Sequence, residues 1–196
     1  MVAYVFDTIL TKGVKAGQVP ARTQAARDWY RKAGRNVNVT PTKLIKENPG
    51  KVVRGFDIGS MMLFQYDPKL KSTLPYYDTF PLVFPFAAKD RGFLGINMHY
   101  LPLKPRAMLM DALYNLATDS RYDENTRLKL TYGVLKRTSQ FKLFKPCVKH
   151  YLSSNIKSRR IKIDSLEWDT ALFLPIARFA KGSASQVWSD SMRKAG

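Results

Sequence analysis

Residues 59–101 constrain the fold most, because their apolar side chains alternate in the manner of β-strands. Phe80, Leu82, Phe84 and Phe86 share one parity of a single run. Successive side chains of a strand point to opposite faces, so such a run lays an apolar row on one face of a sheet. Turn-forming residues separate three runs of this kind. The pattern predicts a small antiparallel sheet of three to four strands, open or barrel-like.

Two prolines limit the position of the middle run in that sheet. Pro81 and Pro85 lie on the parity opposite the phenylalanines. Proline has no N–H to donate to a strand ladder. The run is therefore predicted to be an edge strand or a bulged strand. Residues 93–97 are the better central strand, and Gly95 within them indicates a bulge or a close backbone approach.

The sequence on both sides of this region has mainly helical spacing. Helices are expected over residues 2–12 and 20–33 before the sheet, and over 105–118 and 124–138 after it. Further helices are expected after Pro146, after Asp164 and after Ser183, with a short strand at 161–163. The predicted fold class is α+β, with helices before the sheet and a helical C-terminal half.

The length of 196 residues favours one domain with one core. Its expected parts are a helical and basic N-terminal arm (1–56), the sheet (57–101) and the helical part (102–196). Within the arm, residues 35–56 are expected to be extended, with a short turn at 41–47, and to contact a partner. No run of about 18 apolar residues occurs, so no membrane contact is expected.

Net charge is the strongest global signal, at +18. Residues 1–56 carry a net charge of +8 and residues 104–161 carry +9, whereas residues 57–103 are neutral. Such an excess costs self-repulsion unless a polyanion is bound, and nucleic acid is the common polyanionic partner. An acidic neighbouring protein is the alternative partner.

Basic residues interleaved with aromatic ones cluster in the second basic segment, where no acid occurs between residues 136 and 160. They are predicted to contact DNA phosphates or an acidic subunit without reading base sequence. Basic residues of the second predicted helix and its end are added to this set. The candidate binding residues are Lys136, Arg137, Lys142, Lys145, Lys149, Lys157, Arg159, Arg160, Arg31, Lys32 and Arg35.

Motifs for catalysis or metal binding are scarce. His99 and His150 are the only histidines and Cys147 is the only cysteine, with no zinc-ligand spacing and no phosphate-binding loop. We expect no cofactor, no metal, no catalytic residue and no small-molecule substrate, with His99 in a structural role. The alternative is a metal-dependent nuclease, which would use carboxylates such as Asp57, Asp67 and Asp78 near the ends of the predicted strands.

Several motifs resemble those of a family of small virion-associated proteins from T-even-like phages with contractile tails, including marine and cyanobacterial phages. The resemblance covers about residues 20–192. The motifs are YDPK at 66–69, LPYYD at 74–78, FPL at 80–82, GFLGIN at 92–97, HYLP at 99–102, YLSS at 151–154 and WDTALFLP at 168–175.

This resemblance implies a structural or DNA-associated component of a virion. We therefore expect a non-enzymatic subunit of the neck, tail or baseplate, associated with the packaged DNA end. Its expected partners are other virion proteins and DNA. Its expected location is the virion, and the host cytoplasm during assembly.

Overall fold

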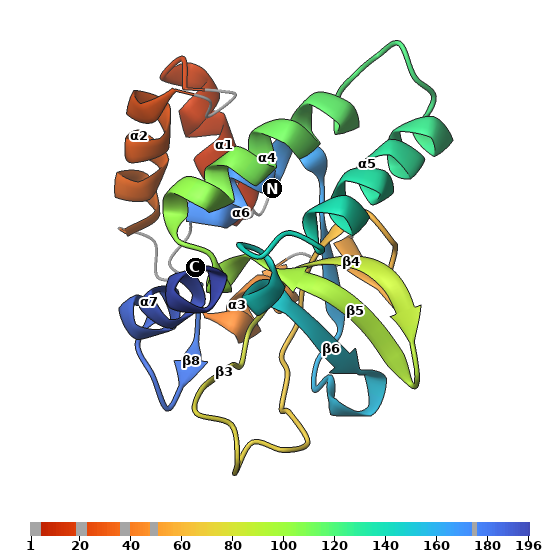
Figure 1. The fold of residues 1–196 in the computed structure, drawn as a ribbon. Coiled ribbons are helices and arrows are strands. Elements are labelled where there is room, and N and C mark those ends of the chain that lie inside the picture. The colour runs from red at the N-terminus through yellow and green to blue at the C-terminus, as the bar shows by residue number, and fades with distance from the viewer. Residues whose placement is uncertain (1–4, 19–22, 36–39, 48–50, 174–175) are drawn as a thin grey trace.

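The computed structural model describes residues 5–18, 23–35, 40–47, 51–173 and 176–196. Helices cover one side of a curved antiparallel sheet (Figure 1). The α-helices are α1 (Val5–Lys15), α2 (Gln24–Arg35), α3 (Pro41–Glu47), α4 (Leu103–Ala117), α5 (Glu124–Thr138), α6 (Trp168–Phe173) and α7 (Ala184–Ala195). Short 3-10 helices include η2 (Met98–Tyr100), η3 (Lys145–Cys147), η4 (Ser153–Asn155) and η5 (Ser165–Glu167).

The main sheet has six strands in the order β1-β7-β2-β4-β5-β6, and a separate pair joins β3 to β8. The strands are β1 (Val52–Val53), β2 (Met61–Leu63), β3 (Tyr77–Asp78), β4 (Leu82–Lys89), β5 (Gly92–Asn97), β6 (Val148–Leu152), β7 (Arg160–Ile163) and β8 (Phe179–Ala180). The α+β class is confirmed, but the prediction of three to four strands is wrong. The sheet is open, because β1 and β6 are two distinct edges.

The predicted meander is confirmed as the centre of this sheet, where β2, β4 and β5 are consecutive neighbours. The register of β4 on β5 shifts between Pro85 and Ala87, so the bulge predicted from the prolines is present and the edge position is wrong. At the bulge the Pro85 carbonyl accepts a hydrogen bond from the Gly59 N–H at 2.9 Å. Because the ladder is interrupted at this bulge, Pro85 is tolerated inside the sheet although it has no N–H to donate.

Both faces of the central strands are covered by apolar side chains. Phe80, Leu82, Phe84 and Phe86 are all buried in the main hydrophobic core beneath the helices, as their shared parity predicts. On the other face, a smaller core is built from Met62, Phe64, Val83, Phe93 and Tyr151. Burial on both faces explains why both parities of β4 carry apolar residues, with Phe84 in the main core and Val83 in the smaller one.

The C-terminal half contributes more strand than its sequence predicts. Residues 148–152, expected in a short helix opened by Pro146, form β6 and pair with β5. The strand predicted at 161–163 is confirmed as β7. Of the two residues whose type suits the cap of the helix over 124–138, Asp123 and Asn125, it is Asp123 that accepts from the Thr126 N–H, at 2.8 Å. The capping-box spacing of Ser183 and Gln186 is confirmed, since Ser183 accepts from the Gln186 N–H at 3.2 Å.

The N-terminal segment packs on the body of the protein. Residues 41–47 form α3 rather than a short turn, and Leu44 has an exposed fraction of 0% within the main core. Residues 52–53 pair with β7, so this part of the arm is not extended toward a partner. Helix α1 continues through Gly13, where the sequence predicted its end, to Lys15.

The buried stripe of α4 is shifted from the one that its sequence spacing predicts, which consists of Met108, Leu109, Ala112, Leu113 and Leu116. Met108 has an exposed fraction of 63%, whereas Arg106 and Met110 are buried. In α5, Leu128 and Leu130 are exposed although their spacing predicted burial. None of the described helices has the length and apolar character that crossing a membrane requires.

Candidate nucleic-acid interface

A basic groove lies along the β1 edge of the sheet. It consists of two adjoining hollows of about 690 and 380 Å³, which share Val52, Ser158 and Arg159 in their walls. Its walls contain cations and no acidic residue. The groove cations are Lys46, Arg54, Lys157, Arg159 and Arg160.

Strand pairing brings these cations together from two distant parts of the chain. β1 pairs with β7 so that Val53 faces Arg160 and Val52 faces Ile161. Lys46 and Arg54 come from the first basic segment, and Lys157, Arg159 and Arg160 from the second.

Backbone hydrogen bonds fix the loop that carries Lys157 and Arg159. The Ser158 hydroxyl accepts from the Gln65 N–H at 2.8 Å, and the Lys157 N–H donates to the Gln65 carbonyl at 2.8 Å. The loop is thereby held against the end of β2 on both sides of Gln65. The exposed Lys157 and Arg159 side chains project from a positioned backbone, which lowers the entropy cost of binding.

The groove keeps its positive charge because its cations form no ion pair with an acidic residue of the described ranges. Among the described residues, no Asp or Glu forms an ion pair with any of the five groove cations. Arg160 is half-buried and donates to the Arg54 carbonyl, and burial lowers the pKa of its guanidinium. Nearby Lys51, in contrast, is paired with Glu167 and with Asp164.

The other candidate residues lie outside the groove walls. Lys136 and Arg137 are exposed in the last turn of α5, and Lys142 and Lys145 are exposed between α5 and β6. Arg31 forms an ion pair with Asp28 on α2, beside an exposed Lys32. The side chain of Arg35 lies outside the described residues. Lys149 lines a separate pocket beside Tyr100. Contact of any of them with a partner stays a prediction.

Lys46 and Arg54 were missed as candidate residues. The net positive charge of residues 1–56 was the only signal in the sequence that could have indicated them. The pairing of β1 with a strand more than a hundred positions later has no local signature, so the sequence could not place them beside Arg159.

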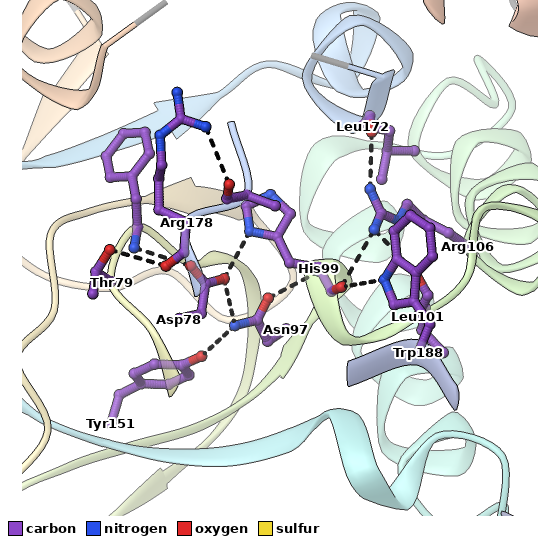
Figure 2. Close-up of polar contacts among 12 residues, drawn as sticks. Asp78, Thr79, Asn97, His99, Leu101, Arg106, Tyr151, Leu172, Arg178 and Trp188 are labelled. Atoms are coloured by element: carbon purple, nitrogen blue, oxygen red, sulfur yellow. Dashed lines mark hydrogen bonds and ion pairs between the residues drawn. The ribbon is translucent and has the colours of Figure 1, made fainter. Parts of the chain in front are cut away.

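A buried polar network occupies the other end of the sheet, and Figure 2 shows its members converging. Asp78 Oδ2 lies 2.7 Å from His99 Nδ1 and accepts from Asn97 Nδ2 at 3.1 Å. Asn97 also donates to the Tyr151 hydroxyl at 3.0 Å, and burial raises the pKa of that hydroxyl. The predicted structural role of His99 fits this geometry. Asp78, expected in an ordinary turn, is instead the buried centre of the network.

The other two carboxylates considered for a nuclease have different partners. Asp57 pairs with Lys162 at 3.1 Å and Asp67 with Lys71 at 3.0 Å. Within the described part of the chain, no three His, Cys, Asp or Glu side chains gather in an arrangement that could hold a metal ion.

In a comparison with known families, residues 6–191 match the family described as the phage T4 terminal DNA protecting protein. Comparisons with curated proteins and with solved structures give no significant match. The family match spans nearly the whole chain and includes every motif on which the resemblance to T-even-like phage proteins rested. The chain therefore belongs to the family of the phage T4 terminal DNA protecting protein.

Proposed function

We propose that this protein binds the end of a duplex DNA molecule without acting on it chemically, and that the basic groove is the contact surface. The observation that carries the proposal is the convergence of five cations, none paired with an acid in the part of the chain that the structure describes, in a groove of a protein from a DNA-protecting family. Within the virion, the bound DNA end would be covered by this protein and by neighbouring virion proteins.

The groove chemistry suits a phosphate backbone. Lysine and arginine side chains neutralise phosphates and release condensed counterions, which makes affinity fall steeply with salt. Arginine adds paired donors that fit phosphate oxygens. Contacts to phosphates carry no information on base sequence, so binding independent of base sequence is expected.

A matched pair of variants tests the groove. Replacing Lys46, Arg54, Lys157 and Arg159 by Gln removes the exposed groove cations, while Arg160 keeps its bond to Arg54 O. The control replaces Lys12, Lys15, Lys104 and Lys129, which are exposed elsewhere, and so removes the same charge. In a titration of linear duplex DNA, the groove variant should lose about three to four units of the slope of log K against log salt. The control should lose less than one.

The same three proteins test whether binding protects a DNA end from degradation. Wild type and control should slow the degradation of linear duplex DNA by an exonuclease, and the groove variant should not. Equal slopes for both variants would remove the groove from the interface. Equal competition by circular and linear DNA would show that the protein does not distinguish an end.

A further inference from the structure

A second recess, separate from the groove, has five tyrosines in its lining. It has a volume of about 310 Å³ and lies between residues 66–78, the end of β5 with η2, β6 and α7. This size is at the lower limit of small-molecule sites, which span about 300–1,000 Å³. The space suits one nucleotide and excludes a duplex. The tyrosines in its wall are Tyr66, Tyr76, Tyr77, Tyr100 and Tyr151.

Two cations complement these rings. Lys149 Nζ lies 4.0 Å from the centroid of the Tyr100 ring, and Lys194 of α7 also lines the pocket. Ser191, only 2% exposed, is a further polar residue of the lining.

The pocket floor is preformed. Asp78 and Asn97 both line it, and they are fixed by their bonds to each other, to His99 and to Tyr151 (Figure 2). A ligand therefore meets a rigid polar edge between aromatic walls. Flat aromatic rings, nearby cations and a few polar groups form the combination that binds a base together with its phosphate.

One segment of the chain connects this pocket to the basic groove. Residues 149–151 line the pocket, and residues 156–160 line the groove. Between them, Ser154 and Asn155 line a hollow of about 280 Å³ together with Lys69 and Arg91. Lys69 and Arg91 thus place positive charge beside this segment, between the groove and the tyrosines.

We propose that the tyrosine pocket receives the terminal nucleotide of a DNA strand, with its base among the tyrosines and its phosphate against Lys149 and Lys194. This inference rests on the proposed function and explains how an end is distinguished from the interior of a duplex. A terminal base leaves the stack at lower cost than an internal one, so only an end supplies a nucleotide readily.

The test compares duplexes that differ only at their ends. One duplex carries an unpaired nucleotide on each strand end, and the other is sealed at both ends by hairpin loops. Wild type should bind the open duplex at least about tenfold more tightly, a difference of about 1.4 kcal/mol. Lys149→Gln with Lys194→Gln, and separately Tyr77→Ser, should abolish this preference and leave binding to the sealed duplex within about twofold.

The outcomes separate the two proposals. If wild type binds neither duplex, the proposed function fails. If wild type prefers open ends and the pocket variants keep that preference, or if wild type binds both duplexes equally, the pocket inference alone fails. Thymidine monophosphate serves as the free-nucleotide probe. Pocket-dependent binding of this probe without any preference for open ends would also overturn the inference. Lys194 is exposed, whereas Lys149 and Tyr77 are half-buried, and thermal unfolding should show both pocket variants folded.

Discussion

At the scale of single residues, Lys149 shows how the fold changes the chemistry of a side chain. Burial lowers its pKa to about 8; Cys147 of η3 acts to raise the pKa, and Lys194 of α7 lowers it further. The Tyr100 ring lies beside Lys149 from η2, and burial raises the pKa of the Tyr100 hydroxyl. Because the Lys149 pKa is lower in the folded state than in the unfolded state, the unfolded chain binds more protons above pH 8. The free energy of unfolding contributed by Lys149 therefore rises with pH.

A Lys149→Met variant isolates this contribution, because Cys147 and Tyr100 titrate in both proteins. In urea unfolding at pH 7, 8 and 9, wild type should gain stability relative to the variant at each step. A difference that is constant over this range would mean that Lys149 is not desolvated in the folded protein.

Single residues were predictable where one local rule applied. The cap at Ser183 was predictable, and that of α5 was narrowed to Asp123 or Asn125, because the bond that each cap makes lies within three residues. The role of Asp78 was not predictable, since its partners His99 and Asn97 approach it only after β3 and β5 are in place. The position of Lys149 also depends on long-range contacts. Its interleaving with Phe144 and Tyr151 in the sequence predicted an exposed surface rather than a pocket wall.

At the scale of elements, two glycines give opposite predictions. A Cβ on Gly92 would lie 1.8 Å from the Tyr151 carbonyl oxygen across the β5–β6 ladder. Gly92→Ala should therefore destabilise the protein by about 3 kcal/mol, because the backbone of one strand must move.

A Cβ on Gly133 of α5 meets nothing within 4 Å, so Gly133→Ala should stabilise the protein by about 0.5–1 kcal/mol through helix propensity. Urea unfolding measures both, and a tolerated Gly92→Ala would contradict the close packing of β6 on β5.

Strands β2, β4 and β5 could be predicted because their apolar rows alternate, and β6 could not. Residues 148–152 mix basic, aromatic and aliphatic side chains without strict alternation, and Pro146 precedes them. Their strand conformation is determined by the open edge of β5, which offers a ladder of unpaired N–H and C=O groups. A tertiary contact of this kind overrides local preference.

At the scale of the whole molecule, the main core joins the two ends of the chain. Ile9, Tyr30 and Leu44 belong to the same hydrophobic cluster as Ile176 and Val187. We therefore predict one cooperative folding unit. Amide hydrogen exchange in increasing urea should show α2 and β5 losing protection at the same midpoint. Earlier loss of protection in α2 would indicate that the N-terminal helices fold separately.

The charge distribution was visible in the sequence, whereas its arrangement was not. The basic segments 1–56 and 104–161 were each recognised, and Lys157, Arg159 and Arg160 were among the candidates. Their meeting with Lys46 and Arg54 depends on the long-range pairing of β1 with β7. The charge counts therefore predicted a polyanionic partner, whereas the groove itself forms only through the pairing of β1 with β7.

The short β1 edge has a consequence for the behaviour of many copies at once. An outer strand that is long and apolar can template strands of other molecules and start aggregation. β1 is only two residues long and runs directly into Arg54, with Arg159 exposed nearby. A second molecule approaching along this edge would bring an identical set of cations and be repelled. The charges that suit a polyanion thus also keep the protein dispersed before it meets one.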